Sequence, residues 1–108
     1  MTSNESLFYQ ICEKYNLSYT KASYNTNEIV VTQPYVLGNY SIIIYCINND
    51  KLFMASKIVA VHNEIRYHEV EPFNSYKFNK LIKKYNRFVL QFKQQKLQQK
   101  LQRINKDF

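Results

Sequence analysis

Residues 77–106, KFNKLIKKYNRFVLQFKQQKLQQKLQRINK, decide how this chain is organised. Ten of its fifteen basic residues lie in this stretch, and no Asp or Glu interrupts them. The apolar residues of the stretch recur at helical spacing, which predicts one long helix. Without acids the helix lacks the Glu-to-Lys pairs that commonly stabilise an exposed helix. The stretch therefore favours contact with an acidic partner.

The net charge of +7 is divided unevenly along the chain. Residues 1–76 carry five Lys or Arg and seven Asp or Glu, whereas residues 77–108 carry ten basic residues and one acid. Charge of one sign on one element attracts nucleic acid, an anionic membrane or an acidic protein surface. The pattern indicates where contact is made and leaves these three kinds of partner open.

The first half of the predicted helix has an apolar side and a basic side. Its apolar stripe is expected to lie across a sheet. The stripe consists of Phe78, Leu81, Ile82, Tyr85, Val89 and Phe92. Four basic residues occupy the opposite side, namely Lys80, Lys83, Lys84 and Arg87.

The second half of this helix changes the phase of the pattern. At about 100° per residue, its apolar positions fall roughly 120° away from the earlier stripe. Those positions are Leu97, Leu101, Ile104 and Phe108. Four cations now occupy the sector that was apolar before: Lys93, Lys96, Lys100 and Arg103. The helix is therefore expected either to bend near residues 93–96 or to project its second half.

Three of the later apolar residues, Leu97, Leu101 and Ile104, form a narrow seam among Gln and Lys. A stripe of this width is typical of a coiled-coil edge, so the seam predicts contact with a partner protein or with a second copy. If the helix bends back, the seam is ordinary core instead. It spans only about three turns, too few to hold a dimer alone, which predicts a monomer or a weak homodimer.

The rest of the chain predicts a small sheet. Leu7, Phe8, Ile11, Cys12 and Tyr15 recur at helical spacing near the N-terminus. Strands are expected over residues 28–33, 40–47, 52–61 and 65–71, with 40–47 in the centre, and residues 17–22 leave a further edge strand open. Short connections favour an antiparallel meander. The expected α+β fold has an N-terminal helix, an antiparallel sheet of about four strands and a long basic C-terminal helix, Asn74 or Ser75 capping the last.

A chain of 108 residues with 45% hydrophobic content encloses one modest core. We expect a single domain over residues 1–108, with residues 93–108 as a helical extension if the helix projects. Cys12 and Cys46 lie in apolar runs and are expected to pack as small hydrophobes. No signal-peptide pattern precedes the first helix, and no stretch approaches the roughly 18 apolar residues of a membrane span. These features predict a cytoplasmic protein.

Motifs for catalysis are missing from the sequence. There is no Gly-rich phosphate loop, no Gly-x-Ser-x-Gly, no Cys-x-x-Cys and no His-Glu-x-x-His, so we expect neither an enzyme nor a cofactor. One group of residues carries ligand or acid-base chemistry: His62, Glu64, His68, Glu69 and Glu71. It matches no metal-ligand spacing, so a turn and an exposed strand face are expected there, with a metal or catalytic site as the second interpretation.

The chain is dense in Asn, Lys, Tyr and Ile and carries the basic run KKYNRFVLQFKQQK at residues 83–96. In this general character it resembles small proteins of phages and mobile elements, including anti-CRISPR proteins. That resemblance implies a single α+β domain that binds a host nuclease complex without catalysis. It rests on no diagnostic motif and transfers no site residues.

Three functions follow as hypotheses. The first is a non-enzymatic inhibitor or modulator of a host nucleic-acid-handling complex, acting on an effector nuclease or its guide RNA through the basic helix. The alternative is a direct DNA- or RNA-binding protein of low sequence preference, dimeric through the seam. In both, the expected contacts are Lys80, Lys83, Lys84, Arg87, Lys93, Lys96, Lys100 and Arg103. A peripheral membrane or structural adaptor is third, because the helix lacks Trp and a broad apolar face.

Overall fold

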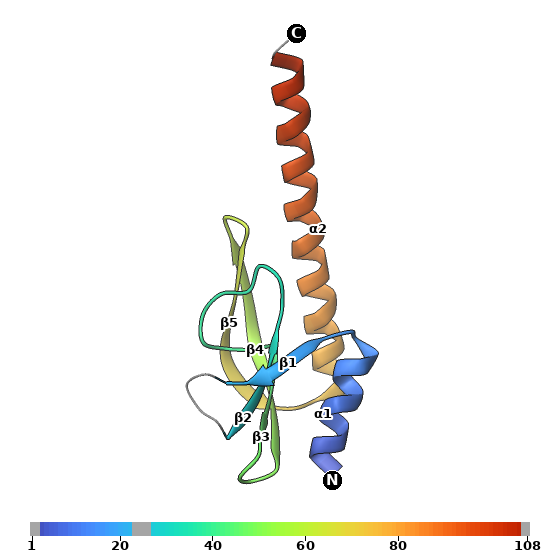
Figure 1. Ribbon diagram of the computed structural model, residues 1–108, viewed down its shortest axis with the longest axis vertical. Coiled ribbons are helices and arrows are strands. Elements are labelled where there is room, and N and C mark those ends of the chain that lie inside the picture. The colour runs from blue at the N-terminus through green and yellow to red at the C-terminus, as the bar shows by residue number, and fades with distance from the viewer. Residues whose placement is uncertain (1–2, 23–26, 107–108) are drawn as a thin grey trace.

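The computed structural model describes residues 3–22 and 27–106, with side chains up to Lys100. In chain order the two helices flank five strands, and both helices lie on the same side of the sheet (Figure 1). The elements are α1 (Ser3–Lys14), β1 (Ser18–Lys21), β2 (Glu28–Thr32), β3 (Ile43–Cys46), β4 (Lys51–Val61), β5 (Glu64–Pro72) and α2 (Ser75–Lys106). The strands form one antiparallel sheet in sequence order. The predicted α+β fold is confirmed. The sheet has five strands instead of about four, because the segment left open at residues 17–22 forms the edge strand β1.

Strand β3 lies in the centre of the sheet, as its apolar sequence predicts. Ile43, Ile44 and Tyr45 are all buried. The strand begins later than the sequence pattern indicated, because the buried side chain of Ser41 takes the place of backbone pairing. Its Oγ accepts a hydrogen bond from the amide of Val31 at 2.9 Å and donates to the carbonyl of the same residue at 2.8 Å. Side-chain bonds of this kind satisfy backbone groups outside the ladder.

The segment after β2 ties three elements together. Val36 forms a parallel bridge with Ile65 of β5, and the amide of Leu37 donates to the Ile65 carbonyl at 2.9 Å. The segment therefore covers part of the free edge of β5, where unpaired backbone groups would invite another strand. Two buried tyrosines hold it in place: the Tyr67 hydroxyl donates to Gln33 Oε1 at 2.7 Å, and the Tyr85 hydroxyl of α2 donates to the Pro34 carbonyl at 2.9 Å.

Helix α2 packs its first half on the sheet and leaves its second half free. The predicted apolar stripe is buried, with Val89 partly so, and burial ends at Phe92, whose exposed fraction is 8%. Every side chain from Lys93 to Lys100 is exposed. Figure 1 shows the helix passing the strands and continuing as an unbent rod, which gives the molecule extents of 61 × 28 × 22 Å. Of the two alternatives at residues 93–96, the helix projects.

Local interactions explain where α2 begins and where α1 ends. The Asn74 Oδ1 atom accepts a hydrogen bond from the Lys77 amide at 3.0 Å, so Asn74 is the N-cap of α2. Asn16 ends α1 in the left-handed conformation, with a φ of 54°.

At the tip of the β4–β5 hairpin, His62 and Asn63 have φ values of 52° and 65°. Two successive positive φ values are the geometry of a type I′ turn, which matches the right-handed twist of the strands.

The two cysteines are free thiols that belong to the packed body. Cys12 is buried and Cys46 is half-buried. Burial raises the pKa of the Cys12 thiol to about 11 and also raises the pKa of Cys46. The thiolate is the reactive form, so neither residue is activated for nucleophilic chemistry near neutral pH.

Among the described residues, no helix combines the length and apolar character that crossing a bilayer requires.

The Asn74 cap generates a stability prediction. Replacing Asn74 with Ala leaves the Lys77 amide without its side-chain acceptor. We expect the free energy of unfolding, measured in urea, to fall by about 1 kcal/mol. The matched control is Asn79→Ala, at an exposed position inside the same helix. That change is expected to be neutral or slightly stabilising, because Ala is the better helix former. Equal losses for the two variants would contradict the capping role.

The thiols generate a reactivity prediction. In the Cys46→Ser variant only Cys12 remains, and at about pH 8 a thiol-specific reagent is expected to label it far more slowly than a free cysteine. The cause is double: Cys12 is buried, and a group with a pKa of about 11 stays protonated at this pH. Labelling should become fast once urea unfolds the chain. Rapid labelling of the folded variant would show that the α1–sheet contact opens readily.

Candidate functional site

Most basic side chains of α2 reach solvent. The cations predicted to bind an acidic partner are exposed at every position whose side chain the structure describes: Lys80, Lys83, Lys84, Arg87, Lys93, Lys96 and Lys100. Arg103 continues the series on the described backbone of the helix, and its side chain lies outside the described ones. The structure brings these residues onto one element, as expected, but not onto one face.

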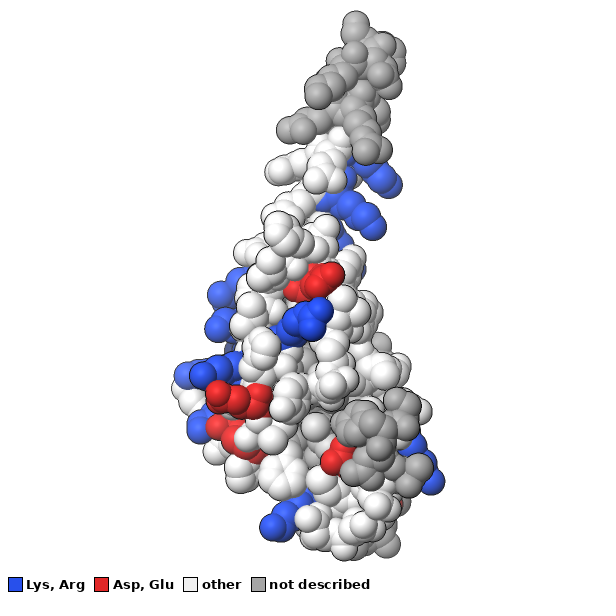
Figure 2. All heavy atoms as spheres, turned by 90° about the vertical axis from the view of Figure 1, so that its left-hand side faces the viewer, with Lys and Arg blue, Asp and Glu red and all other residues white. Residues whose placement is uncertain are grey.

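The cations occupy two faces of the helix. We call Lys80, Lys83, Lys84 and Arg87 the proximal basic face, and Lys93, Lys96 and Lys100 the distal basic face. At about 100° per residue, the centres of the two faces lie roughly 155° apart around the helix axis. Figure 2 shows blue side chains along one edge of the body and others on the opposite edge of the rod. A single flat surface therefore cannot contact both faces.

Few of these charges are neutralised within the molecule. Three ion pairs join Lys57 to Glu69 at 3.4 Å, Arg66 to Glu64 at 3.7 Å and Lys77 to Glu71 at 3.7 Å. Only Lys77 lies on α2. Among the side chains that the structure describes, no other Lys or Arg of this helix lies within 4.0 Å of a carboxylate oxygen. The body does not fold its own acids onto the two faces.

The start of α2 is electrostatically unfavourable without a partner. Its first turn contains no acidic residue, although a helix N-terminus carries a partial positive charge that acids stabilise. Lys77 and Lys80 lie near this end instead, and Lys80 is followed by Lys84 one turn later. Like charges four residues apart repel each other by a few tenths of a kcal/mol. An anion bound here would remove that cost.

A groove opens between strand β4 and helix α2. It has a volume of about 480 Å³ and is lined by apolar side chains of both elements, among them Met54, Ala55, Ile58 and Leu81. Four lysines also line it, namely Lys57, Lys77, Lys80 and Lys84. Glu71, the one carboxylate of the lining, pairs with Lys77, and Glu69 nearby pairs with Lys57. Lys80 and Lys84 keep their charges available to an anion in this groove.

Tyr76 adds an exposed aromatic ring to the proximal basic face. Its exposed fraction is 69%, and the Lys80 Nζ atom lies 4.4 Å from the centre of its ring. The ring positions Lys80 through a cation–π contact, which is worth about 0.5–1 kcal/mol at an exposed site. Tyr76 was not among the residues predicted to contact a partner, because a single aromatic residue in the first turn of a helix is no binding signal by itself.

The apolar seam is exposed where the structure describes it. Leu97 has an exposed fraction of 59%, and Leu90, seven positions earlier, has 56%. Leu90 was not predicted to belong to the seam, yet it lies on the same side of α2 as Leu97, because seven residues make nearly two turns. Leu101 and Ile104 continue the spacing on the described backbone, and their side chains lie outside the described ones.

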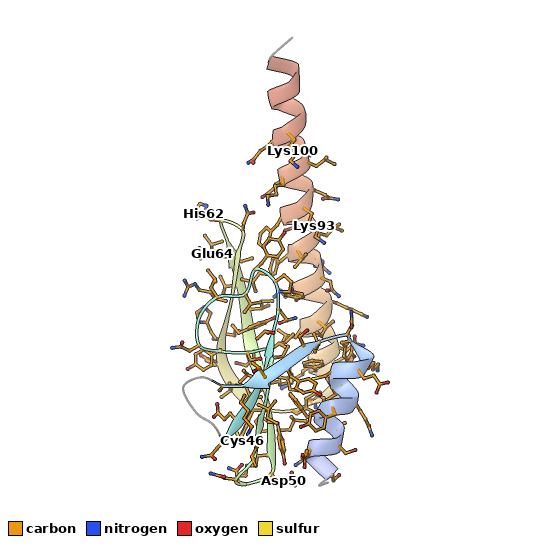
Figure 3. All side chains as sticks on the ribbon, viewed as in Figure 1. Cys46, Asp50, His62, Glu64, Lys93 and Lys100 are labelled. Atoms are coloured by element: carbon orange, nitrogen blue, oxygen red, sulfur yellow. The ribbon has the colours of Figure 1, made fainter. Side chains whose placement is uncertain are left out.

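The polar residues predicted around the β4–β5 hairpin are exposed, apart from the half-buried Glu71. His62 and Glu64 lie at the hairpin tip, and Figure 3 shows them on a different element from Lys93 and Lys100. Glu64 pairs with Arg66, and Glu69 pairs with Lys57. Over residues 3–22 and 27–100, no three His, Cys, Asp or Glu side chains lie close enough together to hold a metal ion. The hairpin is a turn and an exposed strand face.

No protein-family model, curated protein or solved structure matches this chain. No residue role can therefore be taken from a relative. What the protein does has to be inferred from the two basic faces, the groove and the exposed seam of α2.

Proposed function

We propose that this protein is a non-enzymatic binding protein that inhibits or modulates a nucleic-acid-handling complex of a host cell. In this proposal the complex is an effector nuclease with its guide RNA, and the cytoplasm is where the two meet. The proximal basic face and the adjoining groove contact phosphates of the nucleic acid. The anti-CRISPR-like character of the chain agrees with this role.

One observation carries the proposal: the cations of the proximal basic face are exposed and lack carboxylate partners. Lys80, Lys83, Lys84 and Arg87 have no carboxylate oxygen within 4.0 Å among the described side chains. They lie within two turns of one helix, and Lys80 and Lys84 also line the groove. Phosphate groups follow one another along a nucleic-acid strand, so a row of cations on a rigid helix can contact several of them at once.

The contacts expected from this face are to the backbone and not to base edges. Three of its four cations are lysines, which bind phosphate as point charges and present no planar fork of the kind that reads a base pair, and Arg87 alone has such a fork. The described residues also contain no two-helix arrangement that would place α2 in a major groove, since α1 and α2 both pack on the sheet. The nucleic acid would therefore be bound with low sequence preference.

The alternative is a protein that binds free DNA or RNA directly. The same exposed cations favour it, and the two functions differ in whether a host protein is needed. A pull-down from a lysate of the host, with and without nuclease digestion, separates them. A defined nuclease component retained after digestion supports the modulator. Nucleic acid retained from the undigested lysate without any nuclease component supports the direct binder.

Charge reversal tests the contact itself. We expect Lys80→Glu, Lys83→Glu and Lys84→Glu together to weaken binding to a fluorescent hairpin RNA by at least about tenfold, because several phosphate contacts are lost. The slope of log Kd against log salt concentration should also fall in magnitude by about two, because the lost phosphate contacts no longer release counterions. Fluorescence anisotropy at several salt concentrations measures both quantities.

The matched control for this experiment is the triple variant Lys14→Glu, Lys21→Glu and Lys51→Glu. All three lysines are exposed and lie outside α2, and the change in net charge is the same. This control should keep most of the affinity if position on the proximal basic face matters. Equal weakening in both variants would attribute binding to net charge alone. No binding of the unchanged protein even at low salt would remove the nucleic-acid contact.

A further inference from the structure

The exposed seam of α2 offers a second binding surface that the proximal basic face does not use. Leu90 and Leu97 are each more than half exposed and lie seven positions apart, and the backbone places Leu101 and Ile104 on the same side. Residues seven positions apart occupy equivalent inner positions in successive heptads of a coiled coil, and Gln94 occupies the inner position between the two leucines. Covering an exposed apolar stripe of this kind with a second helix removes apolar surface from water, which favours association.

The charges beside the seam are of one sign. Lys93 and Lys100 flank it at positions that, in a coiled coil, face the partner helix. The other flank is formed by Gln91 and Gln98, and no acid occurs anywhere in α2. Both lysines are exposed, and among the described side chains neither lies within 4.0 Å of a carboxylate oxygen. The side chains that would complete these flanks have to come from a partner.

A second copy of this chain is a poor partner for the seam. In a parallel pair of α2 helices, Lys93 of one chain faces Gln98 of the other, which gives no opposite charge. In an antiparallel pair, the lysine flanks face each other and repel. Nucleic acid is equally unsuited, because phosphates would engage the lysines and leave the leucines in water. The seam and its lysine flank together require a partner surface that is both apolar and acidic.

We propose that the seam binds an amphipathic helix of a partner protein that carries leucine-like residues on its inner positions and Glu or Asp on its flanks. Leu90 and Leu97 pack against the apolar side of this helix, and Lys93 and Lys100 pair with its carboxylates. This inference does not rest on the proposed nucleic-acid contact, because it uses other residues on another side of α2. The sequence left open whether the seam binds a second copy of the chain or a partner protein, and this inference selects the partner protein.

Two designed peptides test the inference with the full-length protein. Both have about four heptads with Leu or Ile at the inner positions, one with Glu and one with Lys on its flanks. We expect the acidic peptide to bind and the basic peptide to bind at least about tenfold more weakly. The Leu90→Gln, Leu97→Gln variant should bind the acidic peptide at least about tenfold more weakly. The Lys93→Glu, Lys100→Glu variant should prefer the basic peptide instead.

Controls separate the seam from general stickiness and from charge. The Val59→Gln, Val61→Gln variant changes two exposed apolar residues of β4 and should bind the acidic peptide normally. So should the Lys80→Glu, Lys84→Glu variant on the proximal basic face. All changed residues are exposed, so circular dichroism should show an intact fold for each variant.

Three outcomes would overturn the inference. Equal binding of the two peptides would show that the flanking charges select nothing. Unchanged binding by the Leu90→Gln, Leu97→Gln variant would place the peptide elsewhere. Sedimentation equilibrium that shows a dimer, lost in that variant, would assign the seam to a second copy of the chain. A hairpin RNA that binds normally to the same variant would leave the inference intact, because the nucleic-acid contact lies on the proximal basic face.

Discussion

The structure depends on one geometric constraint: a straight helix presents only one sector to a flat sheet. The apolar stripe of α2 keeps that sector as far as Phe92, and the following lysines then enter it. Because ammonium groups cannot replace the stripe against an apolar core, packing on the sheet has to end there. The length of the sheet contact, the exposure of the rod and the two separate basic faces all follow from this change of phase.

The rod can remain helical without tertiary contacts because the buried half of α2 provides its nucleus. Starting a helix is costly, whereas extending an existing one adds a hydrogen bond for each residue fixed. Gln, Lys and Leu, which dominate this part of the helix, are good helix formers, and cations near a helix C-terminus interact favourably with its dipole. The opposing cost is repulsion among Lys93, Lys96 and Lys100. A bound anionic partner would remove that cost and retain the helix.

Features that depend only on the residues of one helix or strand could be predicted from the sequence. The apolar run of β3, the cap at Asn74 and the buried stripe of α2 each follow from local pattern, and the structure has all three. Edge strand β1 left little signal, because all its side chains are exposed and no alternation remains. Its existence depends on pairing with β2, which is a tertiary contact.

The groove could not be predicted from the sequence for a related reason. The groove combines lysines from β4 and α2, and no spacing along the chain brings Lys57 next to Lys84. Leu90 was not assigned to the stripe or to the seam, although its spacing from Leu97 puts both on one side of α2, and the structure shows that it is exposed. The two surfaces lie on different sectors and different lengths of the helix, so both can be occupied at the same time. Free nucleic acid would leave Leu90 and Leu97 uncovered, and an acidic helix alone would leave the proximal basic face without anions. A complex of protein and nucleic acid supplies both chemistries, which is why we favour it over nucleic acid alone as the target.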